Sequence, residues 1–527
     1  MPIYTHPLDG SPRFPTRLPS DTETALRTLS SRYREQSNWT ATLTNSKDLA
    51  EWINNSKPKV TLYRASDVKF LFDELLGYKN YVGKLKKTWK GFEPDVDAVW
   101  RMDGLLDKVW KKKLMDAAST LASVPKKARG WPTNPPKSAV EDLIDPSMYA
   151  LIYGQTLALK NGEFSQVALS SPNEPSQDHT GCWLPSEFII SEQGTSTKIS
   201  SYINNLTLPG QDVLFHPILE KAFTKMLPLF DHALADLAGG GCSRNRSTRT
   251  VSYTIGEDDY IGDYCSDDEG PPGNAWTPPK IVASRMLRGK TVNVVVRMLE
   301  VKLSANSPVY QAAEPYIDGL ANERIIATGM YLYAKQNVTD VSIEFKLRDF
   351  YPDREEIRNA AGVEGLLSRR DVGTTSMKEN RAIVFPNVYE KRILPFQLQN
   401  RKRYGFVKIL CFHLCDPTHE ETNKMLQTTR TVPPQQPGQF EQILRDTKQL
   451  GKLPEEIFQS ILGYCVGTIL PVKKAMEYKD LMVGDREHMM RWGVNYDSDE
   501  NYDEPIIYND YEGGTEYGGG GFDDFWF

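Results

Sequence analysis

The sequence predicts an α+β fold in which a central β-sandwich or jelly roll is flanked by helical regions at both ends of the chain. Apolar residues recur at intervals of three and four near both ends, which is typical of amphipathic helices. The middle of the chain carries short alternating or apolar runs with few helix signals between them, which is typical of a sandwich or jelly roll. With 527 residues, 39% of them hydrophobic, the chain is long enough for two or three packed units that share a substantial core.

Residues 1–136 are predicted to form an N-terminal helical region. Leu71, Leu75 and Leu76 share one face of a helix, and a second apolar run repeats at three and four from Val99 to Val109. Prolines between residues 125 and 136 then interrupt the helical pattern. We therefore expect the region to end at this proline cluster.

Residues 137–425 are predicted to form the jelly-roll core. An amphipathic helix is expected from about Pro217 to Leu237. Residues 238–279 combine a glycine run, many aspartates and prolines, and this composition predicts a long mobile loop. Strands are expected at 291–303, 324–333, 341–347, 382–389 and 406–415.

Residues 426–493 are predicted to form a C-terminal helical region, with Pro454 at the first position of one helix. The residues expected on the apolar face of that helix are Leu453, Ile457, Ile461 and Leu462. Residues 494–527 contain ten Asp or Glu and no Lys or Arg. Because this segment also has little aliphatic content, we expect a disordered acidic tail rich in glycine and tyrosine.

Composition excludes several classes of protein. The six cysteines form no C-x-x-C pair, which argues against a disulfide scaffold and a thiolate zinc site. No apolar run approaches the roughly 18 residues of a membrane helix, and the polar start of the chain does not resemble a secretory signal. The chain carries no nucleic-acid-binding motif, so its Lys-rich runs are interpreted as solvated helix faces. We expect a cytoplasmic or nuclear protein that binds neither membrane nor nucleic acid.

Short segments occur in a fixed order along the chain: Trp183–Glu187, Lys198–Leu206, Arg288–Lys290, Asn322–Glu323 and Val432–Gln436. They resemble, nearly in register, a fungal family that is known only as a domain of unknown function, family 4246. The resemblance extends from about residue 13 to residue 490. Members of that family look like oxygenases that depend on iron and 2-oxoglutarate. The resemblance therefore implies a cupin-like double-stranded β-helix, a form of jelly roll, at the centre of this chain.

The resemblance also implies where an iron site would lie. The family's ligands are a His-x-Glu motif and a distal histidine, and the matching positions here are Tyr316, Asp318 and Lys391. A protonated lysine has no lone pair, and a tyrosine phenolate suits ferric rather than ferrous iron. We therefore expect a degenerate triad that holds no metal. In its place we expect the Lys391 ammonium to bond to the Asp318 carboxylate and the Tyr316 hydroxyl.

The position of the co-substrate is altered as well. In oxygenases of this kind 2-oxoglutarate needs an Arg or Lys on a late strand, and the family's basic pair matches Val407 and Lys408 here. In an alternating strand, Lys408 lies on the opposite face from Val407 and His413, so we expect it to point away from the cavity. Nearby Arg401 and Arg403 are the candidates to replace it.

Asn322 and Glu323 are expected to line the same cavity, because they follow the degenerate motif directly. His413 is a further candidate for the cavity wall, although a single histidine on a strand is more commonly a packed core residue.

These positions predict a pseudo-oxygenase that needs no cofactor and binds a small molecule or a protein partner in the old cavity. Two alternatives stay open. One is an enzyme: either an oxygenase that uses Fe(II) and 2-oxoglutarate with unusual ligands, or a metal-independent catalyst with Lys391 and Asp318 as acid and base. The other is an interaction module that recruits partners through its acidic tail.

Overall fold

The structure is a computed structural model. It describes residues 21–56, 65–85, 92–96, 98–124, 139–168, 180–206, 211–238, 254–255, 261–262, 287–348, 369–417, 426–465 and 469–492.

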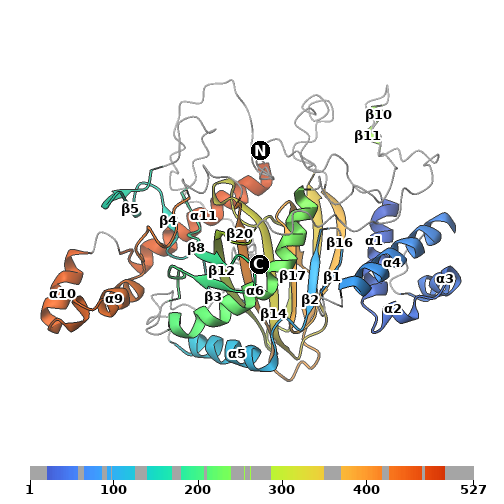
Figure 1. Cartoon of the computed structure of the whole chain (residues 1–527), viewed down its shortest axis with the longest axis horizontal. Coiled ribbons are helices and arrows are strands. Elements are labelled where there is room, and N and C mark those ends of the chain that lie inside the picture. The colour runs from blue at the N-terminus through green and yellow to red at the C-terminus, as the bar shows by residue number, and fades with distance from the viewer. Residues whose placement is uncertain are drawn as a thin grey trace, which may run out of the picture.

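A nine-stranded antiparallel sheet forms the centre of the molecule (Figure 1). Its strands follow the order β1 (Phe92–Pro94), β2 (Trp100–Asp103), β17 (Arg381–Pro386), β14 (Ile325–Gln336), β20 (Gly405–Cys415), β12 (Thr291–Leu303), β8 (Ser186–Ile190) and β9 (Thr197–Ile199), and β3 (Val140–Ile144) also pairs with β12. The β-branched side chains of β12 favour extended chain. The outermost strands β1 and β9 do not pair with each other, so the sheet is open.

One face of this sheet is covered by the helix α6 (Gln211–Ala238), which is green in Figure 1. The ring of Phe223 in α6 lies 5.3 Å from that of Phe412 in β20. Gly329 of β14 faces the same helix, since a Cβ atom there would lie 2.5 Å from the Cε atom of Met226. Because side chains alternate along a strand, the residues next to Phe412 and Gly329 point to the opposite face of the sheet.

That opposite face packs against a smaller sheet of β16 (Arg369–Met377), β15 (Val341–Arg348) and β18 (Tyr389–Ile393). The ring of Phe345 in β15 lies 4.9 Å from that of Phe385 in β17. Two short strands, β13 (Val309–Tyr310) and β19 (Phe396–Gln397), pair with each other. Between β12 and β20 the chain therefore leaves the large sheet and returns to it three times.

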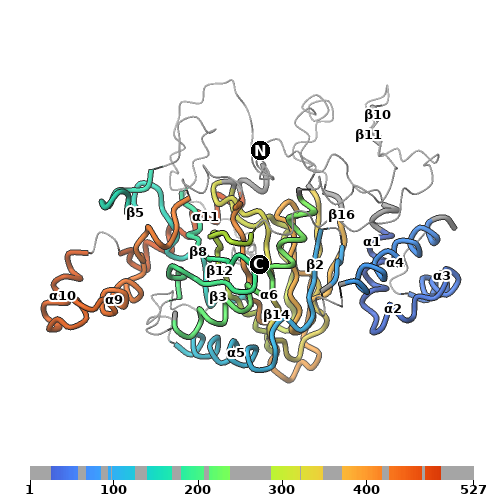
Figure 2. The backbone as a smooth tube through the Cα atoms, viewed as in Figure 1, coloured from blue at the N-terminus to red at the C-terminus, as the bar shows by residue number. Residues whose placement is uncertain are grey.

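The helices near the two ends of the chain lie at opposite ends of the long axis of the molecule (Figure 2). At one end, a separate apolar core that includes Leu29, Leu49 and Leu75 joins α1 (Asp21–Arg34), α2 (Trp39–Thr42), α3 (Ser46–Asn55) and α4 (Ala65–Leu85). At the other end are α9 (Pro437–Asp446), η3 (Leu450–Lys452) and α10 (Glu455–Tyr464). The helix α5 (Lys108–Ser123) packs beside α6 and β3.

The last described helix, α11 (Val472–Trp492), returns to the sheets. Met482 is buried against Trp183 and Ile325, and Lys479 pairs with Asp145 at 3.0 Å. Short elements complete the fold: β4 (Leu151–Ile152) pairs with β7 (Gly181–Cys182), β5 (Leu157–Lys160) pairs with β6 (Glu163–Gln166), β10 (Thr254–Ile255) pairs with β11 (Ile261–Gly262), and η1 (Ala321–Glu323) precedes β14.

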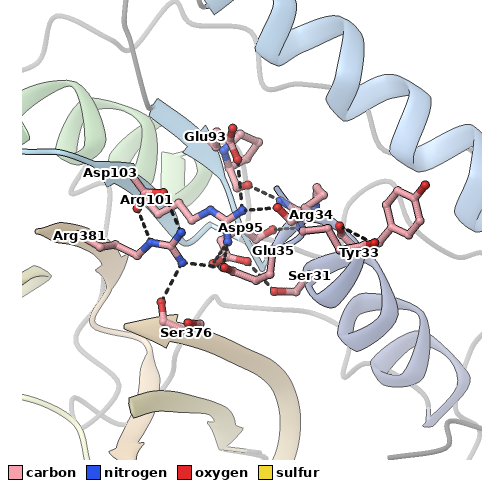
Figure 3. A network of polar contacts seen from close by, with 12 residues as sticks. Ser31, Tyr33, Arg34, Glu35, Glu93, Asp95, Arg101, Asp103, Ser376 and Arg381 are labelled. Atoms are coloured by element: carbon pink, nitrogen blue, oxygen red, sulfur yellow. Dashed lines mark hydrogen bonds and ion pairs between the residues drawn. The ribbon is translucent and has the colours of Figure 1, made fainter. Parts of the chain in front are cut away.

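A partly buried network of charges joins α1 to the sheets (Figure 3), and we call it the docking network. Its members are Arg34, Glu35, Glu93, Asp95, Arg101, Asp103, Lys378 and Arg381. Arg101 of β2 donates to Glu35, to Glu93 at 3.2 Å and to Asp95 at 3.3 Å. Arg381 of β17 donates to Glu35 at 2.6 Å and to Asp103 at 2.9 Å. The network therefore ties the N-terminal helices to two strands of the large sheet.

The predicted helix at 217–237 and most of the predicted strands are confirmed, but three predictions are corrected. Residues 99–107 do not form a helix, because Trp100–Asp103 pairs with β17 as the strand β2 and α5 begins only at Lys108. The predicted strand at 382–389 is divided between β17 and β18, which belong to different sheets. In α10 the buried residue is Phe458, whereas Ile457 is half exposed.

The mixed α and β composition of the fold is confirmed, and the central jelly roll stays a prediction, because the described sheets are open and antiparallel. The predicted boundaries at residues 136, 425 and 493 fall in segments outside the described residues. The predicted tail at 494–527 is also outside them, as is the predicted loop at 238–279 except for Ala238, β10 and β11. No described helix is both long and apolar enough to cross a bilayer.

Candidate functional site

The three residues predicted from the oxygenase resemblance lie together between the two sheets. Tyr316 forms a bridge with Lys391, the third residue of β18, in which each backbone amide donates to the other residue's carbonyl, at 3.0 and 2.8 Å. Asp318 follows two residues later, so its side chain points to the same side as that of Tyr316. The backbone bridge therefore explains why Tyr316, Asp318 and Lys391 lie close together, as the sequence predicts.

Lys391 and Asp318 form a buried ion pair. The Lys391 Nζ atom lies 2.5 Å from Asp318 Oδ1, and the two residues are only 4% and 2% exposed. The same ammonium lies 4.2 Å from the centre of the Tyr316 ring. Lys391 thus contacts the carboxylate, as the sequence predicts, and contacts Tyr316 through the face of its ring as a cation–π pair.

The second oxygen of the carboxylate is also bonded. Thr328 of β14 donates its hydroxyl to Asp318 Oδ2 at 2.6 Å. His413 of β20 places Nδ1 3.0 Å from the same hydroxyl and 3.5 Å from Asp318 Oδ2. Thr328 and His413 lie side by side because they are direct partners in the register of β14 and β20.

Burial and charge act in opposite directions on this cluster. Burial favours a raised pKa for Asp318, but Lys391 and His413 overcome it and hold the pKa well below its ordinary value. Burial lowers the pKa of Lys391, and the Asp318 carboxylate opposes that shift. Burial also lowers the pKa of His413, again opposed by Asp318. The carboxylate is therefore the fixed charge around which the other groups are arranged.

Asn387, in the turn between β17 and β18, holds the backbone of Asp318 in place. Its amide oxygen accepts from the Asp318 amide at 3.0 Å, and its amide nitrogen donates to the Asp318 carbonyl at 2.7 Å and to the Ile325 carbonyl at 3.0 Å. The side chain is fully buried. Asn387 is thus a positioning residue for the carboxylate.

These residues do not fit a ferrous ion. Asp318 Oδ1 is already bonded to the ammonium of Lys391, which has no lone pair to donate to a metal while it is protonated. Deprotonating Lys391 would leave the buried carboxylate without its nearest counter-charge. The donor set is that of an internal ion pair.

Asn322 and Glu323, predicted to line the cavity, lie in η1 beside the segment 181–183. Glu323 accepts from the Trp183 amide at 2.6 Å and from Arg486 of α11 at 2.5 Å. Asn322 donates to the Tyr153 hydroxyl at 2.9 Å. The hydrogen bonds of Glu323 therefore hold α11 and the segment 181–183 against the sheet.

The two predicted co-substrate residues lie away from Asp318. Lys408 pairs with Glu300 of β12 at 3.3 Å, on the face of β20 opposite to His413. Arg403 lies exposed in the turn before β20, where its carbonyl accepts from Asn337. The predicted orientation of Lys408 agrees with this placement.

Sequence reasoning missed Thr328, Asn387 and Trp183 as members of the site. The one signal that marks Thr328 is that it is the only threonine or serine within β14, whose other residues near it are apolar or glycine. Nothing local marks Asn387, whose role depends on backbone groups of distant residues. The ring of Trp183 lies 5.4 Å from that of His413.

Comparisons with known proteins give a family but no activity. A family described as "Protein of unknown function (DUF4246)" matches residues 65–442, a shorter span than the predicted 13–490. No curated protein matches the chain.

Several solved structures resemble parts of the chain. IDO from Bacillus thuringiensis is 9% identical, with a TM-score of 0.26, and the match covers 64% of this chain and 99% of that one. The Fe(II)/α-ketoglutarate-dependent dioxygenase TqaL is 10% identical, with a TM-score of 0.21 and coverages of 59% and 93%. A bsmA homologue from Methylobium petroleophilum PM1 is 6% identical, with a TM-score of 0.24 and coverages of 65% and 94%. With scores this low, the three similarities carry no argument about this chain.

Proposed function

This chain belongs to the DUF4246 family of proteins of unknown function, and we propose that it is a pseudo-oxygenase in which an internal ion pair replaces the iron site. In this proposal the central sheets are a double-stranded β-helix, and the space between them serves to bind a small molecule or a protein partner. Neither iron nor 2-oxoglutarate takes part.

The contact between Lys391 and Asp318 carries the proposal. Burying either charge alone would cost several kcal/mol, whereas a bonded pair with further hydrogen bonds offsets much of that cost. Both residues are nearly inaccessible, and Thr328 completes the bonding of the carboxylate. In this proposal the Lys391 ammonium takes the place of the metal cation beside the Asp318 carboxylate.

The chain path supports the fold part of the proposal. From β12 to β20 the chain passes repeatedly between the large sheet and the smaller sheets, which is consistent with the two layers of a jelly roll. Tyr316 and Lys391 meet between those layers, which is where an oxygenase of this kind would hold its metal.

The enzyme alternative is less favoured by the same contact. An acid and a base that act on a substrate need free lone pairs or protons directed at it, whereas Lys391 and Asp318 are bonded to each other. The interaction-module alternative concerns residues 494–527, outside the described residues, and stays a prediction.

Metal content after anaerobic loading with Fe(II) tests the proposal. The native chain is compared with the variant Tyr316→His/Asp318→Glu/Lys391→His, each desalted before elemental analysis. We expect stoichiometric iron in the variant and only background iron in the native chain. Stoichiometric iron in the native chain would refute the proposal.

A matched control separates the site from adventitious binding. His419, Glu420 and Glu421 also spell a His-x-Glu sequence and lie outside the described residues. The change His419→Gln, added to both proteins, should leave both iron contents unchanged. If the variant lost its iron on this change, the iron would have been bound at His419 and not at positions 316, 318 and 391.

A further inference from the structure

Hydrogen bonds around Asp318 fix the tautomer of His413. Ionised Asp318 only accepts, so the Thr328 hydroxyl gives its single proton to Asp318 Oδ2. The Thr328 oxygen must then accept from His413 Nδ1, which therefore carries the proton. A neutral imidazole protonated on Nδ1 has a bare lone pair on Nε2.

The Nε2 atom of His413 is buried and has no hydrogen-bond partner among the described residues. His232 is a useful contrast, because it is also buried but uses both nitrogens: Nε2 with the Tyr81 hydroxyl at 3.1 Å and Nδ1 with the Pro228 carbonyl at 2.6 Å. A buried polar atom without a partner calls for a ligand or a water molecule to complete it.

A second unpaired acceptor borders the same segment of chain. Asn322 uses its amide nitrogen twice, toward the Tyr153 hydroxyl and toward the Gly181 carbonyl at 3.2 Å. Its amide oxygen is buried without a partner in the part of the chain that the structure describes. Gly181 lies two residues before Trp183, whose ring packs against His413. Both unpaired atoms therefore border residues 181–183, and both are acceptors.

The buried cations around this segment are already matched. Lys391 is bonded to Asp318, Arg297 binds Asp142 through two bonds of 2.7 and 3.0 Å, and Arg486 is bonded to Glu323. An anionic ligand would compete with Asp318, Asp142 and Glu323 for these cations, and displacing any of these carboxylates would leave it buried without its partner. A neutral donor has no such cost.

We propose that His413 Nε2, beside Trp183, is the acceptor that recognises a small neutral molecule carrying an N–H or O–H donor on an apolar body. The surrounding residues Val295, Ile325 and Met482 are apolar and buried, so they suit such a body. The inference rests on the proposed function, since it names the ligand class of the same site. It excludes a dicarboxylate such as 2-oxoglutarate as the preferred ligand.

Side-chain nitrogen NMR of the full chain, labelled at histidine, tests this proposal with indole as the probe. Benzothiophene has nearly the same shape but lacks the N–H, and 2-oxoglutarate provides the anionic comparison. We expect the Nδ1–H tautomer at His413, a shift of its Nε2 resonance on titration with indole, and no shift at His232. Benzothiophene should bind about threefold to tenfold more weakly, because it forgoes one hydrogen bond, and 2-oxoglutarate should cause no shift.

Two variants test whether the Thr328 hydroxyl sets the tautomer of His413 and the affinity for indole. The change Thr328→Ser keeps the hydroxyl and should keep both the tautomer and the affinity for indole, whereas Thr328→Val should lose the tautomer preference and weaken indole binding by a similar factor. The melting temperature of each variant is measured alongside, and the native chain decides the question if a variant fails to fold.

Either of two results would overturn the proposal: equal affinities for indole and benzothiophene, or a His413 Nε2 resonance that indole does not move, as expected if a buried water completes this atom. Iron determination on the same samples keeps the two proposals separate. A native chain that binds indole and also takes up iron refutes only the pseudo-oxygenase proposal, whereas one that binds neither refutes only the ligand proposal.

Discussion

The docking network, whose members Asp103 and Lys378 are exposed, and the buried cluster around Asp318 are both groups of charges, but their hydrogen bonds are completed differently. In the docking network each guanidinium of Arg101 and Arg381 is shared among several carboxylates and carbonyls, and cations and carboxylates are equal in number. Among the described residues, the cluster around Asp318 has a single ammonium, a single carboxylate and a histidine with one unpaired nitrogen.

This difference separates a structural role from a binding role. A network whose members satisfy one another holds two parts of a fold together and needs nothing further. A cluster in which the charges are satisfied but a neutral acceptor is left over is held in place by its charges and can still take a ligand. The predictions below disturb each cluster in turn.

Arg101→Met should have the largest effect on stability. It leaves Glu35, Glu93 and Asp95 without their shared cation, and breaking such a buried arrangement costs about 3–5 kcal/mol. Urea unfolding gives the free energy, and hydrogen exchange should show faster exchange in α1–α4. The matched control is Arg430→Met, which removes an ion pair of a 70% exposed arginine and should change neither measurement. Equal effects of the two changes would contradict a docking role for the network.

Lys391→Met should lower the unfolding free energy by about 3 kcal/mol, since it leaves the buried Asp318 carboxylate without its counter-charge. This loss of unfolding free energy should be smaller than that of Arg101→Met, because only one carboxylate loses its counter-charge and that carboxylate can take up a proton. The double variant Lys391→Met/Asp318→Asn should recover most of the loss, and a double-mutant cycle measures the coupling. An unchanged stability in the single variant would contradict the ion-pair account of this site.

Acid should weaken the docking network before the Asp318 cluster. Lys378, Arg101 and Arg381 overcome the effect of burial and lower the pKa of Glu35 from 4.5 to about 2. A depressed carboxyl pKa stabilises the fold above the unfolded-state pKa, and that contribution is lost as the pH falls through the folded-state pKa. Allowing for partial exposure, the loss should be about 2 kcal/mol between pH 5 and pH 2.

Unfolding free energies measured over this pH range should show a smaller decline for Glu35→Gln than for the native chain. The control Glu51→Gln, at an exposed site in α3, should decline as the native chain does. Parallel curves for all three proteins would argue against Glu35 as the acid-sensitive member.

Lys408→Met should have the smallest effect, about 1 kcal/mol. Its partner Glu300 keeps a second cation, Lys302, at 3.7 Å, so the carboxylate is not stranded. The change should also leave the His413 resonances in place, because Lys408 lies on the other face of β20. A shift of those resonances would show that Lys408 reaches the site after all.

Much of the secondary structure could be predicted from the chain alone, because its patterns are local. The strand at 291–303 and the helix at 217–237 follow from apolar periodicity within a few residues. The prediction at 99–109 is wrong for the opposite reason: pairing with β17, a strand nearly three hundred residues away in sequence, overrides a local helical pattern.

The sequence by itself determined the residue types at positions 316, 318 and 391, the incompatibility of a lysine with a ferrous site, and the opposite orientation of Lys408 and His413 along one strand. Only the tertiary structure decided that Thr328 and His413 are register partners, that Asn387 holds Asp318, and that one nitrogen of His413 has no partner within the part of the chain that the structure describes. The physical reason is that hydrogen bonds are satisfied in space: whether a buried polar atom has a partner depends on strands and turns that the local pattern of the chain does not bring together.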